Sequence, residues 1–353
     1  MSEEASSTGW DAIEEAMAKL YGAQEPKHYG TLVPYMLGGN DPLDGISAYK
    51  AEQPYPHWHF VTFGFSELYD KESDNAEQSG YGFELTFRLA REEEEEEPPA
   101  WALNLLQNMG RYVFKSGNVF HSGDYLDANG PICLGSDTKL TALAFIDDPE
   151  LPETDTPNGK VQFLQMIGIT GCELEAMMTW NTRGLLKACE AHMPRYITDL
   201  SRDSFLQEPD VAAAVQQGIE RDGSNTAFLY VDQLGWEPPQ KRLFGKKPAV
   251  LKLGAKQAGT VGKLLKGRIL KGEFLYLSGQ EISVVLEPGE QPGFEADDEM
   301  VRILLDETSA AELSRKLQPK EGVIELSSMN GMTVQVLKTY IKDQDGNVVS
   351  TIG

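Results

Sequence analysis

Two histidines one residue apart, His57 and His59, are the clearest candidates for chemistry in this 353-residue chain. They lie in the run YPHWHFVTFGF, which has the composition of a β-strand. Alternate residues of a strand point to the same side, so both imidazoles could bind one metal ion. A zinc site needs three or four protein ligands. Two hypotheses therefore stay open: a metal-dependent enzyme that uses His57 and His59, or histidines that form hydrogen bonds beside an aromatic core.

The other candidate ligands and catalytic patterns are weaker. Cys189 and His192 lie in a stretch that we predict to be helical, where a cysteine is usually a small buried residue. The segment GAKQAGTVGKLL, residues 254–265, lacks the Ser or Thr that must follow the lysine of a phosphate-binding loop. The sequence contains neither G-x-S-x-G nor G-x-G-x-x-G. We therefore expect no enzyme activity, no cofactor and no metal.

The net charge of −24 indicates the kind of partner to expect. Residues 1–240 hold 40 acidic and 15 basic residues, a balance of −25, and residues 241–353 hold 15 and 16, a balance of +1. An acidic surface repels phosphate backbones and attracts basic proteins. We expect a protein or extended-peptide partner, basic in character, and no nucleic acid.

The cysteines and the hydropathy along the chain predict the cellular compartment. The three cysteines are odd in number and have no ligand-like spacing, which is typical of a reducing compartment. The N-terminus is acidic and lacks the apolar core of a signal peptide. The sequence has no apolar run of about 18 residues, the length needed to cross a bilayer. We expect a cytoplasmic protein with no membrane partner.

The elements that must position these residues mix helices and strands. Residues 9–22 predict an amphipathic helix, residues 57–65 and 82–90 predict strands, and residues 100–117 predict a second helix. In the second strand we expect Glu84, Thr86 and Arg88 to face outward. The six glutamates of residues 92–97 predict a solvated loop. Asn158-Gly159 gives the strongest hairpin signal in the chain.

A change in composition in the stretch GWEPPQKRLFGKKP predicts a domain boundary near residues 236–248. We place domains at residues 1–238 and 249–353, joined by a linker at residues 239–248. In the second domain, residues 249–253, 259–279 and 281–287 predict strands separated by glycines. Because no regular βαβ alternation is visible, the predicted fold class is α+β, with two domains that are each a mixed sheet flanked by helices.

Six separated blocks, in one order, resemble a known family. The blocks are YMLGGNDPLDGISAYK, PHWHFVTFGFSELYD, GYGFELTFRLA, RYVFKSGNVFHSGD, ITDL and GIERDGSN. Over about residues 10–235 the chain strongly resembles the Suppressor of fused family. It lacks the long insertion that animal members carry before their C-terminal domain, and in this it looks like a bacterial-type member.

The resemblance implies a non-enzymatic protein that binds a protein partner in a cleft between its two domains. Animal members hold an extended peptide there as an added strand. Tyr112 in RYVF and Asp124 in HSGD match positions that line that cleft, so the resemblance implies that they bind the partner. For a bacterial-type member it implies an immunity protein that neutralises a polymorphic toxin. The alternative is a cytoplasmic regulator or scaffold that binds an extended peptide.

Overall fold

The computed structural model describes residues 7–33, 35–241, 246–297, 299–342 and 347–353. The chain forms two compact units, each described here by itself. The N-terminal unit comprises Met1–Leu174 and Leu186–Ala212, and the C-terminal unit comprises Glu175–Leu185 and Ala213–Gly353. Both units combine helices with mixed sheets, so the predicted α+β class is confirmed. None of the helices in the described ranges is long and apolar enough to cross a membrane.

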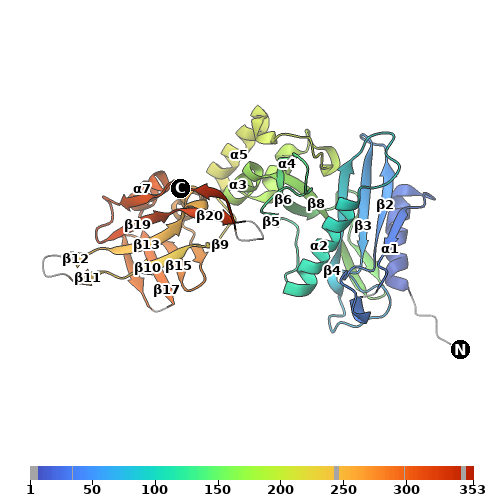
Figure 1. Cartoon of the computed structure of the whole chain (residues 1–353), viewed down its shortest axis with the longest axis horizontal. Coiled ribbons are helices and arrows are strands. Elements are labelled where there is room, and N and C mark those ends of the chain that lie inside the picture. Colours follow the sequence, from blue (N-terminus) through green and yellow to red (C-terminus); the bar gives the residue numbers. More distant parts are fainter. Residues whose placement is uncertain (1–6, 34, 242–245, 298, 343–346) are drawn as a thin grey trace. The chain divides into compact units, whose positions relative to one another are not determined.

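An eight-stranded sheet forms the centre of the N-terminal unit (Figure 1). Its strands are β1 Lys27–Gly30, β2 Gly45–Ala51, β3 His57–Phe63, β4 Gln78–Ala90, β5 Tyr125–Asp127, β6 Leu140–Asp147, β7 Thr154–Thr156 and β8 Gly159–Thr170. The order is β1-β2-β3-β4-β8-β6-β5, with β7 paired to β8. Only the β4–β8 pair is parallel among these described strands. The two edge strands of this order are therefore β1 and β5.

Two helices cover opposite faces of this sheet. On one face, α1 (Thr8–Tyr21) packs Ile13 and Met17 against Val61 and Phe63. On the other face, α2 (Ala100–Ser116) packs against Phe60 and the remaining aromatic side chains of β3 and β4. The central strands therefore have no solvent-facing side, and they read as continuous runs of buried residues.

The covered second face overturns one prediction. Glu84, Thr86 and Arg88, which we expected to face outward, are fully buried. The alternation itself is correct, because these residues lie on the opposite side of β4 from Phe83 and Leu85. That side of β4 is covered by α1 and its surroundings rather than by water. The polar character of these side chains therefore did not indicate exposure to solvent.

Three helices follow β8: α3 Gly171–Thr179, α4 Thr182–Cys189 and α5 Pro209–Asp222. Short 3-10 turns occur at Tyr35–Leu37, Pro194–Tyr196 and Phe205–Gln207.

The C-terminal unit contains two mixed sheets and two hairpins. The sheets have the orders β10-β13-β19-β18 and β16-β17-β15-β14-β9, and the hairpins are β11-β12 and β20-β21. The strands are β9 Phe228–Tyr230, β10 Leu234–Glu237, β11 Gln240–Lys241, β12 Lys246–Lys247, β13 Ala249–Gly254, β14 Leu275–Ser278, β15 Ser283–Pro288, β16 Gly293–Ala296, β17 Met300–Leu305, β18 Gly322–Glu325, β19 Met332–Leu337, β20 Thr339–Lys342 and β21 Val348–Ile352. The helices are α6 Ala255–Arg268 and α7 Glu307–Lys316, with a 3-10 turn at Ile269–Lys271.

One element of this unit differs from the prediction. Much of residues 259–279, expected to be strands, belongs to helix α6. Its buried Ala258, Val261 and Leu265 follow helical spacing. The glycines that suggested strand breaks instead permit close packing: a Cβ on Gly262 would lie 2.9 Å from the carbonyl oxygen of Leu317, after α7.

The predicted division at residues 239–248 stays a prediction. Strands β9 and β10 precede that segment, and they pair with β14 and β13 of the C-terminal unit. Within the segment, β11 pairs with β12. Residues 242–245 lie outside the described part of the chain.

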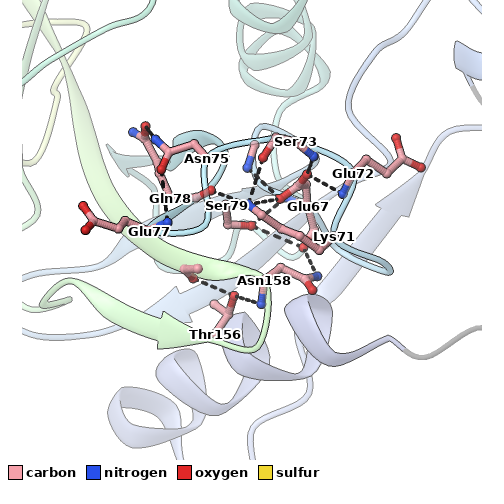
Figure 2. Close-up of polar contacts among 12 residues, drawn as sticks. Glu67, Lys71, Glu72, Ser73, Asn75, Glu77, Gln78, Ser79, Thr156 and Asn158 are labelled. Carbon is pink, nitrogen blue, oxygen red and sulfur yellow. Dashed lines mark hydrogen bonds and ion pairs between the residues drawn. The ribbon is translucent and has the colours of Figure 1, made fainter.

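The loop between β3 and β4 is organised by one carboxylate, that of Glu67 (Figure 2). It accepts hydrogen bonds from the ammonium group of Lys71 at 2.8 Å, from the amide of Glu72 at 2.8 Å and from the amide of Ser73. Burial raises the pKa of Glu67, but these donors outweigh burial and lower it to about 2. Asn158, in the predicted hairpin turn between β7 and β8, donates to the carbonyl oxygen of Glu67 at 2.9 Å.

Helix α1 begins directly against this loop. The amides of Gly9 and Trp10 donate to the carbonyl oxygen of Leu68 at 3.0 and 3.1 Å. A Cβ added to Gly9 would lie 2.1 Å from the carbonyl oxygen of Glu67. The first turn of α1 therefore has room only for glycine at this position.

Gly9→Ala should destabilise the protein by about 1–3 kcal/mol, because the methyl group overpacks the contact between α1 and the loop. In an open helical position the same change would be stabilising. Urea unfolding followed by circular dichroism measures the shift in midpoint. Gly171→Ala, at the start of α3, is the control, since its Cβ would meet only Thr141 Oγ1 at 3.5 Å. Equal midpoints for the two variants would contradict the close packing.

Candidate partner-binding site

Tyr112 lies near the C-terminal end of α2 and is 36% exposed. The helix ends at Gly117, which adopts the left-handed conformation that favours glycine. The ring of Tyr112 stacks on Phe120, with ring centroids 5.5 Å apart. Its hydroxyl oxygen accepts a hydrogen bond from Asn118 Nδ2 at 3.1 Å. The ring is thus held in place on one side and accessible on the other.

Asp124 lies at the entrance to β5. Its Oδ2 accepts a hydrogen bond from the amide of His121 at 2.7 Å, which closes the turn before the strand. Its carbonyl oxygen accepts one from the amide of Phe145 on β6 at 2.9 Å. The side chain of Asp124 is nevertheless 46% exposed. Asp124 therefore has a structural role and still presents charge to solvent.

Phe120 connects the two predicted residues. It stacks on Tyr112 on one side and on Phe145, at 4.1 Å between ring centroids, on the other. The amide of Phe145 in turn bonds to the backbone of Asp124. Tyr112 therefore packs against residues 117–127, the segment that contains Asp124. Their role in binding stays a prediction.

The edge of the sheet at β5 is the feature that sequence reasoning missed. Asp124 and Ala128 make backbone bonds across to Phe145 and Thr141. In an antiparallel ladder the residues between such positions turn their backbone groups the other way. The backbone of Asp127 therefore points away from β6, at the end of the strand order. The turn signals on both sides of Tyr125-Leu126 could have revealed this short strand.

This edge is bordered by acidic side chains. Asp124 lies in the turn before β5, Asp127 is the last residue of β5, and Asp147 is the last residue of β6. Asp147 accepts a hydrogen bond from Ser122 Oγ at 2.7 Å. An exposed strand edge is a template for an added strand. Neighbouring carboxylates favour an added strand that carries lysine or arginine.

His57 and His59 are fully buried on the α1 face of the sheet. Nδ1 of His57 donates to the carbonyl oxygen of Tyr55 at 2.8 Å. Nδ1 of His59 lies 2.7 Å from the hydroxyl of Tyr21, which belongs to α1. Nε2 of His59 lies 3.5 Å from Asp148 Oδ2, which is longer than a good hydrogen bond. These contacts tie β3 to α1 and to the segment after β6.

A buried ion pair stands beside His59. Arg88 donates to both carboxylate oxygens of Asp148, at 2.7 and 3.0 Å, and Thr86 donates to Asp148 at 2.6 Å. Burial, followed by the charge of Arg88, lowers the pKa of His59 to about 4. Burial also lowers the pKa of His57 to about 4. Both imidazoles are neutral at pH 7, and the adjacent guanidinium opposes a cation at this position, which favours the hydrogen-bonding hypothesis.

The third histidine considered in the sequence, His192, has a different environment. Cys189 is buried, and His192 turns away to Asp210, with Nε2 3.0 Å from Oδ2. His192, Glu208 and Asp210 are exposed, and among the described residues they form the group whose spacing could hold a metal ion. The hydrogen bond that His192 donates to the Asp210 carboxylate raises the pKa of His192. These contacts are those of an exposed ion pair.

Asp148→Ala should destabilise the N-terminal unit by about 3–5 kcal/mol, because it removes the fully buried counter-charge of Arg88 and leaves only the partly exposed Glu150, at 3.1 Å, to balance the guanidinium. Urea unfolding gives the change in free energy. Glu153→Ala, which removes the exposed partner of Lys160, is the matched control and should leave the midpoint near that of the wild type. A small effect for both substitutions would show that the buried pair is dispensable.

The two buried histidines should make the protein less stable as the pH falls from 6.5 to about 4. In that window the unfolded imidazoles bind protons and the folded ones do not, so each imidazole costs up to about 1.4 kcal/mol per pH unit. His57→Gln/His59→Gln should therefore show a flatter profile of unfolding free energy against pH. His121→Gln, at an exposed position, serves as the control. Parallel profiles for wild type and double variant would refute the assignment.

Comparisons with known proteins now bear on identity. A family model described as Suppressor of fused protein (SUFU) matches residues 39–203. The human and mouse proteins named Suppressor of fused homolog are each 39% identical to this chain over 238 residues. These matches cover 62% of this chain and 48% of each relative. The chain thus spans about half the length of the curated relatives it matches.

Two solved structures are similar as well. The crystal structure of Drosophila Suppressor of Fused has a TM-score of 0.77 at 24% identity, and the match covers 94% of this chain and 97% of that one, which supports the fold. The crystal structure of the Sufu-Fu complex contains a chain 34% identical to this one, with a TM-score of 0.56. That match covers 60% of this chain and 98% of the other. This chain belongs to the Suppressor of fused family.

Proposed function

We propose that this protein sequesters or neutralises a protein partner by accepting an extended, basic segment of it as a strand added to β5. The observation that carries the proposal is the edge position of β5, with Tyr112 and Asp124 beside it. Main-chain hydrogen bonds would supply affinity, and the side chains around the edge would supply selectivity. Binding of this kind requires no catalytic residue.

The family supports a binding role. One solved relative is the Sufu-Fu complex, in which a Suppressor of fused protein is held with Fu. A partner for the present chain is part of our proposal, because the chain spans only part of its curated relatives. A cleft in which the predicted domain at residues 249–353 forms the second wall is also part of our proposal.

Within this role we propose the task of an immunity protein that covers a basic toxin in the cytoplasm. The −25 balance of residues 1–240 supports this task, because it would speed encounter with a cationic protein. A cytoplasmic regulator or scaffold would use the same edge for a different partner. Co-expression with basic toxins distinguishes the two, because only an immunity protein restores growth against its cognate toxin.

The β5 edge can be blocked without disturbing the sheet. Asp127→Pro removes an amide that points away from β6 and should leave the β5–β6 ladder in place. We expect peptides selected from a displayed random library on the wild-type protein to be rich in lysine or arginine. Their affinity for Asp127→Pro should fall by about tenfold, because at least one main-chain bond is lost. Isothermal titration calorimetry measures the change.

Asp127→Ser is the matched control, since it removes the same carboxylate and keeps the amide. Its affinity should fall less than that of Asp127→Pro. Selected peptides that are acidic, or that bind both variants equally well, would argue against strand addition at β5. Unfolding midpoints of the two variants show whether the sheet is intact.

A further inference from the structure

The dipeptide Asn-Gly occurs three times in this chain, at residues 129–130, 158–159 and 330–331. In such a pair the backbone nitrogen of glycine can attack Cγ of asparagine and expel ammonia. The resulting succinimide ring takes up water and opens to aspartate or isoaspartate. Glycine has no side chain to hinder the attack, and it gives the backbone the freedom that ring closure needs. Because the dipeptide is the same at all three positions, the surrounding structure decides which of them reacts.

Asn158 is held in place by the fold (Figure 2). It is 5% exposed, and its Nδ2 donates to the carbonyl oxygens of Glu67 and Tyr69, at 2.9 Å each. Gly159 is packed as tightly, because a Cβ at this position would lie 2.7 Å from the carbonyl carbon of Gln78. Ring closure at this pair therefore requires both hydrogen bonds to break and the turn to leave its packing.

Asn129 is exposed but partly restrained. It follows β5, and its backbone amide donates to Asp127 Oδ1 at 2.9 Å. Its Nδ2 donates to the carbonyl oxygen of Asp127 at 3.3 Å, which is long for a hydrogen bond. The next residue, Gly130, is open, since nothing in the described part of the chain would lie within 4 Å of a Cβ built there. The restraint at this pair is therefore weaker than at Asn158.

Asn330 lies in the turn between β18 and β19 and is exposed. Its side chain has no hydrogen bond to any residue that the structure describes. The following Gly331 is also exposed and has a φ of +90°, and a Cβ built on it would meet no described atom within 4 Å. The Asn330 side chain can therefore approach the glycine nitrogen without giving up a hydrogen bond.

The residues on either side of this third pair are fixed. The amide of Ser328 donates to the Glu312 carboxylate at 2.9 Å. Met329 and Met332, which flank the pair, are each 2% exposed and belong to the apolar core of the C-terminal unit. Isoaspartate continues the chain through its side-chain carboxyl group, so it lengthens the backbone by one methylene between these fixed points. A close-packed core responds to a change of that size.

We propose that Asn330-Gly331 is a site of spontaneous deamidation, whereas the fold keeps Asn158-Gly159 intact. The glycine nitrogen forms a bond to Cγ of Asn330, and its proton leaves with the side-chain nitrogen as ammonia. Hydrolysis of the ring consumes one water molecule, and no oxidant, reductant or enzyme takes part. The product carries a new carboxylate and, where isoaspartate forms, a longer backbone before β19. The inference goes beyond the proposed function, because it predicts a time-dependent chemical change in the C-terminal unit.

Peptide mapping by mass spectrometry can follow the three asparagines in the full chain during storage in mildly alkaline buffer. We expect the peptide that contains Asn330 to convert about tenfold faster or more than the one that contains Asn158, since reaction at Asn158 requires a local opening that breaks two hydrogen bonds. Asn129 should convert at an intermediate rate. The same chain in concentrated urea is the control, because the three pairs should then react at similar rates.

The effect of the extra methylene is measured by urea unfolding. Stored wild type should unfold at a lower urea concentration than fresh protein, whereas Asn330→Gln should keep its midpoint, because its longer side chain closes a ring much more slowly. Fresh Asn330→Asp is the matched control for charge. It supplies the carboxylate without the longer backbone and should unfold like the fresh wild type.

Four results would overturn the proposal. In the folded chain these are conversion of Asn158 or Asn129 at least as fast as that of Asn330, and an unmodified Asn330 at a time when the chain in urea has reacted. The third is stored wild type that contains isoaspartate at residue 330 and keeps its unfolding midpoint. The fourth is a midpoint of fresh Asn330→Asp as low as that of stored wild type, which would assign the loss of stability to charge.

Discussion

The buried ion pair between Arg88 and Asp148 is the constraint on which the N-terminal unit depends. A guanidinium and a carboxylate removed from water must satisfy each other, and this fixes the central strand β4 against the segment after β6. The neighbouring His59 is neutral because of burial and that guanidinium, and its ring reaches Tyr21 of α1. Polar contacts therefore hold one part of the α1 face together, and apolar packing that includes Met17 and Phe63 holds the other.

Because helices cover both faces of this sheet, only its perimeter is open to an added strand, which is the mode of binding that we propose for β5. The two edges differ in chemistry. At β5 a short strand offers backbone groups beside aspartates, whereas beyond β1 the chain exposes apolar side chains. The acidic character of the β5 edge agrees with the charge balance of residues 1–240. Charge would bring cationic partners to the protein, and backbone or apolar contacts would then select among them.

Sequence patterns predicted correctly which residues share one side of a strand, but they did not predict whether that side is buried. The side on which His57 and His59 lie, the hairpin at Asn158 and the end of α1 at Gly22 all follow from local rules. Whether Arg88 faces water depends on α1, which is distant in sequence. The glycines of α6 led to the wrong prediction of strands. Glycine is typical of a break between strands, and it is also required for close packing against α7. Strand β5 has three residues, too few for any periodicity to appear.

The brevity of β5 has a consequence for the protein in a crowded cell. A long, flat, apolar edge would invite copies of the same chain to stack into fibrils. Three residues flanked by aspartates give an identical neighbour few bonds and a repulsive charge. Because β5 is short, a true ligand must gain most of its binding free energy from contacts outside the ladder. The short length of β5 therefore disfavours self-polymerisation and also makes binding more selective.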